Sequence, residues 1–262
     1  MTKDDLQPRC ELGQQQLMRT EYLDAEATLA AAEADAWRLR DFDTLSRLYM
    51  PLQEARRQRR QVCGEGVVCL DLIATGPQDA IDGRRVVENF PHGQLLVAGW
   101  GSIEPALRVR ALQREHKLYI ETFLAAVYPV GPSSSGRAVV ITPSEDVALP
   151  DLQPRAMDDL IRRLPAHCIV LGAETLPVGT RKGDTSTYAE VMAMWEQLHA
   201  PFLAAADATV DPVRKIEGYR LTQRVDYGCE LAHQKASDVA RELARAATIA
   251  RGASGAPPAR QG

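Results

Sequence analysis

Four short apolar runs in the middle of the chain constrain its fold more than any other feature of the sequence. They are VVCLDLIA at 67–74, LLVAG at 95–99, AVVIT at 138–142 and CIVLG at 168–172. Each run is continuous instead of alternating with polar residues, which is typical of strands whose two faces are both covered. We therefore expect a sheet of about four buried strands.

Helical patterns lie between these runs. Apolar residues at 103–128 fall on one helical face, among them Leu112, Tyr119 and Phe123, and a second such pattern spans 154–164. An order in which strands and helices alternate is typical of a parallel sheet with right-handed crossovers. The sequence thus predicts the α/β class, with a small, mainly parallel sheet that has helices on its faces.

Both ends of the chain are expected to be helical. Apolar residues at 12–61 keep close to the helical period, although Pro51 predicts a kink or an early end there. Helices are expected again after a polar loop, with a break at Asp211 and Pro212. We predict four parts: an N-terminal helical hairpin at 1–64, a central α/β domain at 65–185, C-terminal helices at 186–251 and a disordered tail at 252–262.

Two stretches of these helical ends share a pattern of residues. In LRDFDTLSRLYMPLQEA at 39–55, Leu45 takes a small-residue position, Tyr49 the aromatic position after it and Leu52 the next small position. In RKIEGYRLTQRVDYGCELAHQKA at 214–236, the residues that match are Ile216, Tyr219, Val225, Asp226 and Ala232. The first stretch resembles the second half of a tetratricopeptide repeat, and the second is similar to a junction between two such repeats.

The sequence departs from the pattern of that family in three ways. Pro51 interrupts the first stretch, and Thr222 replaces the usual small residue in the second. The two stretches also flank the central segment instead of standing in tandem, whereas an array needs about three stacked repeats. The resemblance covers less than half of the chain and implies helical hairpins that contact a protein partner. The alternative is amphipathic hairpins that pack on the α/β core.

The loop AGWGSIEP at 98–105 is the first candidate for ligand binding, because ligands bind at the carboxyl ends of strands in open α/β sheets. Gly99 and Gly101 allow close approach of the backbone, and Ser102 is suited to cap the helix that follows, whose free N–H groups favour an anion. Glu104 stands where the dinucleotide fingerprint has its third glycine, so we expect no nicotinamide cofactor. The alternative is a tight turn with a helix cap.

The loop GTRKGDTSTYAE at 179–190 is the second candidate. It combines flexibility, positive charge and a hydroxyl group in Gly179, Arg181, Lys182, Gly183 and Thr185. Its glycines are too close together for a Walker A loop, and its lysine precedes the second glycine. The alternative is a mobile, solvated loop.

Several classes of site lack their usual residues. No Cys-x-x-Cys or His-x-x-x-His pair occurs, so we expect no metal ion, and the five widely spaced cysteines are expected to be reduced thiols. No serine stands in a G-x-S-x-G motif, so the sequence identifies no catalytic residue and we expect no cofactor.

Charge and hydropathy restrict the partners. With a net charge of −4, the chain has no overall basic field, and we expect no nucleic acid partner. The basic run ARRQRRQ at 55–61 is interpreted as the solvated end of a helix, with an anionic partner as the alternative. No apolar stretch approaches the roughly 20 residues of a membrane span, and the polar N-terminus has no apolar signal core. These features predict a cytoplasmic location.

Two hypotheses for function remain. The first is a non-catalytic protein in which an α/β core is framed by repeat-like helices that contact a protein partner. The second is an enzyme or small-ligand binder that takes a phosphorylated or otherwise anionic molecule at the carboxyl edge of the sheet. The observation that would narrow this choice most is whether the loop at Gly99–Ser102 and the loop at Gly179–Thr187 line the same pocket, which the sequence leaves open.

Overall fold

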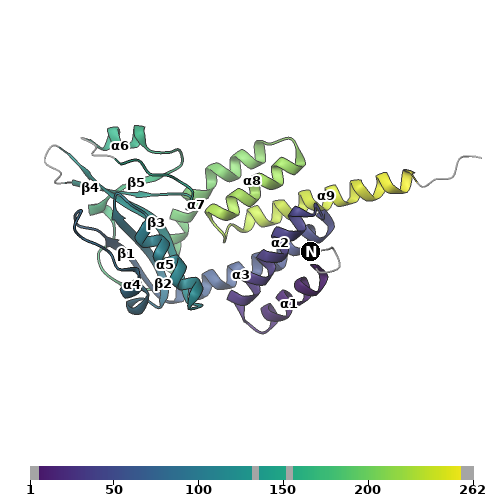
Figure 1. Cartoon of the computed structure of the whole chain (residues 1–262), viewed down its shortest axis with the longest axis horizontal. Helices are drawn as coiled ribbons and strands as arrows, with labels where there is room; N and C mark the ends of the chain where they lie inside the picture. Colours follow the sequence, from purple (N-terminus) through teal and green to yellow (C-terminus); the bar gives the residue numbers. More distant parts are fainter. Residues whose placement is uncertain (1–5, 132–135, 152–155, 255–262) are drawn as a thin grey trace, which may run out of the picture. The chain divides into compact units, whose positions relative to one another are not determined.

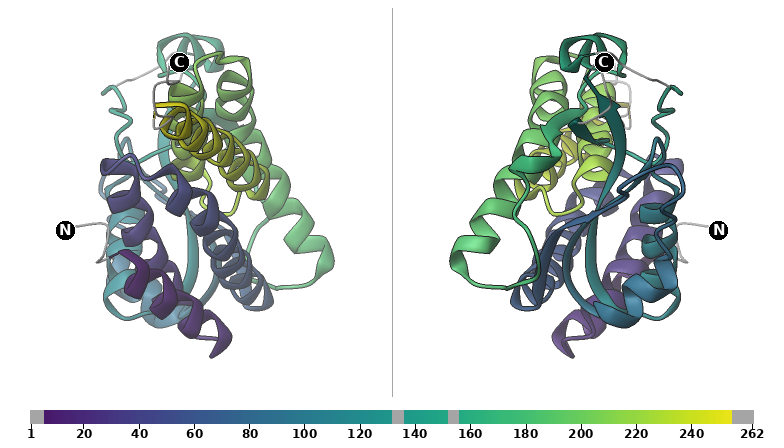
Figure 2. Two further views of the ribbon diagram at one scale, coloured as in Figure 1. Left: turned by 90° about the vertical axis from the view of Figure 1, so that its right-hand side faces the viewer. Right: turned by 90° about the vertical axis from the view of Figure 1, so that its left-hand side faces the viewer.

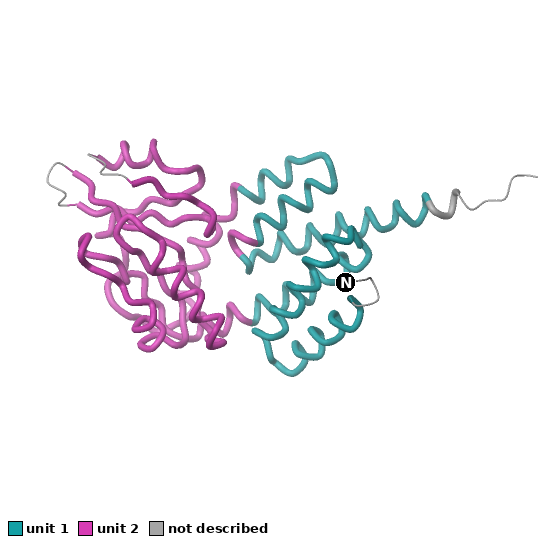
Figure 3. The backbone as a smooth tube through the Cα atoms, in the orientation of Figure 1, with its two compact units in different colours: residues 1–58, 202–223, 227–262 teal, residues 59–201, 224–226 magenta. Residues whose placement is uncertain are grey.

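The computed structural model describes residues 6–131, 136–151 and 156–254, and it combines helices with a sheet (Figure 1). The chain divides into two compact units (Figure 3). The helical unit comprises residues 1–58, 202–223 and 227–262, and the α/β unit comprises residues 59–201 and 224–226. The predicted α/β class with flanking helices is therefore confirmed.

A curled, six-stranded sheet forms the centre of the α/β unit (Figure 2). Its spatial order is β5-β4-β3-β2-β1-β6. The strands are β1 (Val67–Ile73), β2 (His92–Trp100), β3 (Tyr119–Val130), β4 (Gly136–Ile141), β5 (Ile169–Gly172) and β6 (Arg181–Lys182). The first three strands are parallel to one another, whereas β4, β5 and β6 each pair antiparallel with their neighbours.

The prediction of about four mainly parallel strands is thus only partly confirmed. All four apolar runs contain strands, but those at 138–142 and 168–172 became the antiparallel β4 and β5. Only five residues separate Val130, the last residue of β3, from Gly136, the first residue of β4. A parallel return needs a crossover of about a dozen residues or more. The short connection therefore requires β4 to run antiparallel to β3.

The central strand β3 is absent from the sequence prediction, which assigned residues 103–128 to one helix. The helix α5 (Glu104–Glu115) ends early, and Lys117 adopts a φ of 50° in the turn that leads into β3. Nearly every residue of β3 is buried, because the strand lies in the middle of the sheet and is covered on both faces. Such a strand has no polar alternation, so the helical spacing of Tyr119 and Phe123 was uninformative.

Different helices cover the two faces of the sheet. The helix α5 and the short α4 (Gly83–Asn89) pack on one face, where Val109 and Ile120 belong to the same buried cluster. Phe123 faces the other way, because its position in the strand is odd relative to Ile120. Its ring stacks on Trp195 of α7 (Thr185–Ala208), with the ring centroids 4.2 Å apart.

A further helix, α6 (Met157–Arg163), covers the other end of the sheet. In α6, Leu160 is buried in a cluster with residues of β3 and β4. The 3-10 helix η2 (Ala173–Thr175) directly follows β5. The predicted helix at 154–164 therefore matches α6, and it lies beside the antiparallel part of the sheet.

Helices from both ends of the chain build the helical unit. They are α1 (Leu6–Met18), α2 (Tyr22–Arg38), α8 (Pro212–Val225) and α9 (Glu230–Ser254), together with the first part of α3 (Phe42–Glu65) and the last part of α7. Residues that carry the repeat-like pattern in the two stretches share one hydrophobic core: Leu45, Tyr49, Leu52, Ile216, Tyr219 and Ala232. Stretches that stand far apart in the sequence thus pack together.

Two details of the helices bear on the sequence analysis. Pro51 does not end α3, which continues to Glu65. A proline within a helix costs about 3 kcal/mol, and the complete burial of Tyr49 and Leu52 on either side offsets that cost here. The break predicted at Asp211 and Pro212 is present, because α8 begins at Pro212.

The last helix of the chain extends into the segment that was predicted to be a tail. The helix α9 continues to Ser254, and residues 255–262 of the predicted tail lie outside the described residues. Within the described part of the chain, no helix combines the length and the apolar character that crossing a membrane requires. The cysteines are free thiols, of which Cys168 is half-buried and the other four are buried.

Candidate functional site

The loop after β2 forms the predicted tight turn, and Ser102 stands one residue before Ile103, which is the N-cap of α5. Gly99 and Ser102 make an isolated β-bridge, and a Cβ atom on Gly99 would lie 2.8 Å from both the ring of Pro105 and the carbonyl oxygen of Ser102. Gly101 has a φ of 61°, in the left-handed region that favours glycine. Ser102 Oγ accepts a hydrogen bond of 3.1 Å from the amide of Glu104, the first residue of α5. The two glycines are therefore explained by the geometry of the turn.

The second loop contributes the edge strand β6, which lies next to β1. Arg181 and Lys182 form β6 and pair with Val68 and Val67, the first residues of β1. A Cβ atom on Gly183 would meet the carbonyl oxygen of Gly64 at 2.0 Å, so this position requires glycine. These contacts hold the loop against β1, while Gly179, Lys182 and Thr185 are exposed, as the alternative prediction of a solvated loop expects.

At the start of α7, the side chain of Asp184 occupies two of the amide N–H groups that could otherwise bind an anion. Asp184 Oδ1 accepts hydrogen bonds from the amides of Ser186 and Thr187, at 2.8 and 2.9 Å. The hydrogen bond from the Thr187 amide is the main reason why the pKa of Asp184 is lowered. Thr185 is the first residue of the helix, and Arg181 is paired with Glu190 at 2.8 Å.

The structure does not bring the two loops into one pocket. Gly101 follows the last residue of β2, whereas Arg181 and Lys182 pair with the first residues of β1, which is parallel to β2. These positions are about 20 Å apart along the strands, at a rise of about 3.3 Å per residue. The two loops therefore lie at opposite ends of these parallel strands, which answers against a shared pocket, a question that the sequence left open.

A cavity does exist at the carboxyl ends of β1, β2 and β3. Its volume is about 580 Å³. Trp100, Gly101 and Tyr128 line it together with Thr75 and Asp151. Burial raises the pKa of Tyr128 to about 12, and its hydroxyl donates to the carbonyl oxygen of Pro150 at 2.9 Å. No lysine or arginine is among the described residues that line this cavity, which does not suit a phosphorylated ligand.

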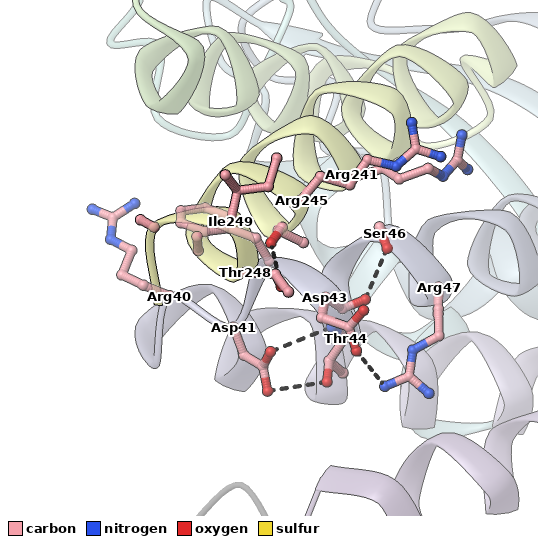
Figure 4. A pocket seen from close by; sticks show the side chains of 14 residues that line it. Arg40, Asp41, Asp43, Thr44, Ser46, Arg47, Arg241, Arg245, Thr248 and Ile249 are labelled. Carbon is pink, nitrogen blue, oxygen red and sulfur yellow. Dashed lines mark hydrogen bonds and ion pairs between the residues drawn. The ribbon is translucent and has the colours of Figure 1, made fainter. Parts of the chain in front are cut away.

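The helical unit contains a larger groove, of about 1100 Å³, between the start of α3 and the last part of α9 (Figure 4). We call it the α3–α9 groove. The turn before α3 and its first turns contribute Arg40, Asp41, Phe42, Asp43, Thr44, Ser46 and Arg47. The helix α9 contributes Arg241, Ala244, Arg245, Ala247, Thr248, Ile249 and Ala250. No residue of this groove is among the ligand-binding candidates predicted from the sequence.

The two acidic residues of the α3–α9 groove are bound within their own helix. Asp41 caps α3, because its carboxylate accepts bonds from the amide and the hydroxyl of Thr44 at 3.4 and 3.1 Å. Asp43 pairs with Arg47 one turn along the helix, at 3.0 Å (Figure 4). Both carboxylates therefore have partners that belong to local helix structure.

The arginines of the groove differ in how firmly they are held. Arg241 pairs with Asp238 at 3.0 Å on the surface of α9, and Arg40 lies over the ring of Trp37 at 4.1 Å. The side chain of Arg245 makes no hydrogen bond or ion pair with any other residue that the structure describes. Exposed pairs contribute about 0–1 kcal/mol, so these guanidinium groups are available to an outside anion at low cost.

A buried ionic network in the α/β unit was also absent from the sequence prediction. Arg60 donates to Glu121 on β3 at 2.5 and 2.9 Å and to Asp226 at 2.6 Å. Gln94 donates to the second oxygen of Glu121 at 2.8 Å, and His199 Nδ1 lies 2.6 Å from Asp226 Oδ2. Each carboxylate is therefore matched by hydrogen bonds, which is the arrangement that a buried ionic network requires.

The burial of Arg60 shows that the basic run at 55–61 is not simply the solvated end of a helix, as the sequence had suggested. The side chain of Arg60 is only 6% exposed. The signal in the sequence was positional, because Arg60 stands three residues before the buried Cys63 and four after Arg56, on one face of α3. Burial alone would raise the pKa of Asp226, but the charge of Arg60 and the bonds from His199 and Arg60 lower it well below its usual value.

Metal chemistry and known families offer no further indication of a site. Among the residues with described positions, no three His, Cys, Asp or Glu side chains come together in a group that would hold a metal ion. Comparison of the chain with family models, with curated proteins and with solved structures found no match in any of the three.

Proposed function

We propose that the protein is a non-catalytic interaction protein whose helical unit binds a partner protein. The observation that carries this proposal is the α3–α9 groove, with its four arginines and a volume of about 1100 Å³. All cationic residues that line it are arginines, and arginine is enriched in protein interfaces, whereas lysine is depleted.

The groove also offers apolar surface that the core of the helical unit does not use. Ile249 lines it and is 72% exposed. Phe42 lines it as well and is only partly buried against the core. Exposed apolar groups rimmed by polar ones are typical of surfaces that bind another protein.

The experiment that tests this proposal is site-specific photo-crosslinking in cells. A photoreactive benzoyl-phenylalanine replaces Ala247 in the groove or, as the control, the exposed Arg85 of α4 in the α/β unit. We expect a covalent adduct with a defined protein at position 247 and none at position 85. That protein is then purified, and its affinity for the full chain is measured with and without Ile249→Ser, which is expected to weaken it.

Three outcomes would contradict the proposal. The first is the absence of an adduct at position 247, and the second is the same set of adducts at positions 247 and 85. A purified candidate whose affinity does not change with Ile249→Ser would also speak against the groove as the binding surface.

A small-ligand binder or enzyme that uses the cavity at the carboxyl ends of β1, β2 and β3 is the second candidate. Its volume of about 580 Å³ falls in the range of known ligand pockets, and its position is the usual one in open α/β sheets. Because Asp151 lines the cavity and no lysine or arginine is among its described lining residues, we expect its ligand to be an uncharged or cationic molecule. A thermal-shift screen of neutral molecules and amines, repeated with Trp100→Ala, is the test; a hit unaffected by that change would exclude this cavity.

A further inference from the structure

The charges of the α3–α9 groove indicate what kind of segment it takes. We infer that the occupant of the groove is an acidic peptide segment of the partner protein, an inference that rests on the proposed function. The carboxylates of this segment bind Arg241 and Arg245, and an apolar side chain of the segment contacts Phe42 and Ile249.

The balance of charge favours a carboxylate-bearing occupant. Four arginines and two aspartates line the groove, an excess of two positive charges among its lining residues, and Arg40 and Arg241 have further, exposed partners in Glu217 and Asp238. Arginine stays protonated at any pH at which the protein is folded. Because Asp41 is bound by Thr44 and Asp43 by Arg47, neither carboxylate neutralises the arginines of α9. A peptide segment that carries about two carboxylates would balance the positive charge of the residues that line the groove.

The arginines of α9 are placed to bind two carboxylates together. Arg241 and Arg245 stand four residues apart on one helix, so they lie one turn apart and about 6 Å along its axis. In Figure 4 both side chains extend from α9 in the same direction. Side chains two residues apart in an extended peptide are separated by about 6.5–7 Å. Acidic residues at alternate positions of an extended segment would therefore match this pair.

The cost of taking up such a segment is small on the protein side. Arg245 has no bond to give up among the described residues, and the pair of Arg241 with Asp238 is exposed. Replacing an exposed pair by one at a desolvated interface strengthens the attraction, because the effective dielectric constant falls. Apolar contact with the exposed Ile249 adds affinity that does not depend on salt.

A nucleic acid fits these observations less well. Binding to its phosphates needs a basic stripe that neutralises many charges, whereas this groove has an excess of two and belongs to a chain with a net charge of −4. Nucleic acid binding is therefore kept as an outcome that would overturn the inference.

The test is a fluorescence anisotropy titration of the full chain with a labelled peptide in which glutamates alternate around a central leucine. The comparison probes are the same peptide with glutamines and a labelled single-stranded oligonucleotide. We expect the acidic peptide to bind more tightly than either comparison probe. Its affinity is expected to fall as salt rises, since Debye screening weakens ionic contacts.

Paired variants identify the groove. Arg241→Gln with Arg245→Gln is expected to weaken binding of the acidic peptide about tenfold, which corresponds to about 1.4 kcal/mol. The matched control is Arg84→Gln with Arg85→Gln, which removes two exposed arginines from α4 and is expected to leave binding unchanged. Arg245→Gln alone, which breaks no described contact, is expected to show a smaller loss with an unchanged thermal midpoint.

Each result bears on the inference. Equal affinity for the glutamate and glutamine peptides, tighter binding of the oligonucleotide, or the same loss in both double variants would overturn it. The crosslinking at position 247 separates the two proposals. An adduct there, together with failure of the acidic peptide, leaves the interaction function standing and removes the acidic occupant; the absence of an adduct removes the interaction function itself.

Discussion

Replacing Arg60 tests whether the buried network of Arg60, Glu121 and Asp226 stabilises the α/β unit. Methionine is the informative substitution, because it keeps much of the aliphatic length and adds no new charge. Glu121 and Asp226 are 3% and 1% exposed, so Arg60→Met leaves two carboxylates buried without their guanidinium group. Breaking a buried ion pair from one side costs about 3–5 kcal/mol.

A second, smaller contribution comes from Trp195. The guanidinium carbon of Arg60 lies 5.2 Å from the centre of the Trp195 ring, and such a contact contributes about 0.5–2 kcal/mol. We therefore expect Arg60→Met to lower the free energy of unfolding of the α/β unit by at least about 3 kcal/mol at neutral pH. Adding Glu121→Gln and Asp226→Asn should restore a large part of that loss, because the remaining polar groups are then uncharged.

The assay is urea denaturation followed by tryptophan fluorescence in a Trp37→Phe background. Trp37 belongs to the helical unit, whereas Trp100 and Trp195 belong to the α/β unit, so the fluorescence then reports on the α/β unit alone. Arg114→Met is the matched control, because Arg114 is an exposed arginine whose ion pair with Glu145 is also exposed. That control is expected to change the free energy of unfolding by less than about 1 kcal/mol.

The stability deficit of Arg60→Met is also expected to depend on pH. In Arg60→Met the buried carboxylates gain from protonation, so its deficit relative to the wild type should shrink as pH falls. A loss below about 1 kcal/mol at neutral pH, or a triple variant no more stable than Arg60→Met, would show that the network does not stabilise the fold.

Three further predictions concern other parts of the chain. The lowered pKa of Asp226 stabilises the fold at pH values above the pKa of about 3.9 that this carboxyl has in the unfolded chain, and the stabilisation is lost as pH falls below that value. Asp226→Asn should therefore reduce the fall in the free energy of unfolding between about pH 5 and 2, measured by chemical denaturation, and an unchanged fall would contradict this. Gly183→Ala places a Cβ atom against the Gly64 carbonyl and should cost about 1–3 kcal/mol in the same assay, whereas Gly76→Ala, with no atom within 4 Å, should change it by less than about 0.5 kcal/mol. Leu29→Ala in the core of the helical unit should cost about 2–5 kcal/mol by thermal denaturation, and a loss below 1 kcal/mol would show that this cluster is loosely packed.

Much of the secondary structure follows from local sequence. Continuous runs of β-branched and aliphatic residues predicted β1, β2, β4 and β5, because such residues suit a strand that is covered on both faces. The turn at Gly99–Ser102 and the hydrogen bond that Ser102 accepts from the Glu104 amide were equally local, since they depend on residues within a few positions of one another. The start of α8 at Pro212 follows from the fixed φ of proline.

The strand β3 marks where this local information ends. Complete burial removes the alternation that identifies a strand, so Tyr119 and Phe123 fitted a helical period as well. Burial on both faces is a consequence of being in the middle of the sheet, which depends on partners elsewhere in the chain.

Which of the candidate site residues come together was likewise decided by contacts between distant parts of the chain. Arg181 and Lys182 were expected at the carboxyl edge, but pairing with β1 holds them at its beginning. Arg60 sits in a basic run whose other arginines keep part of their surface exposed, and only the approach of Glu121 and Asp226 makes it a buried ion. The arginines of the α3–α9 groove come from segments about 200 residues apart in the sequence. Periodicity and turn chemistry act over a few residues and are visible in the sequence, whereas the meeting of charges across such separations is decided by packing of the whole chain.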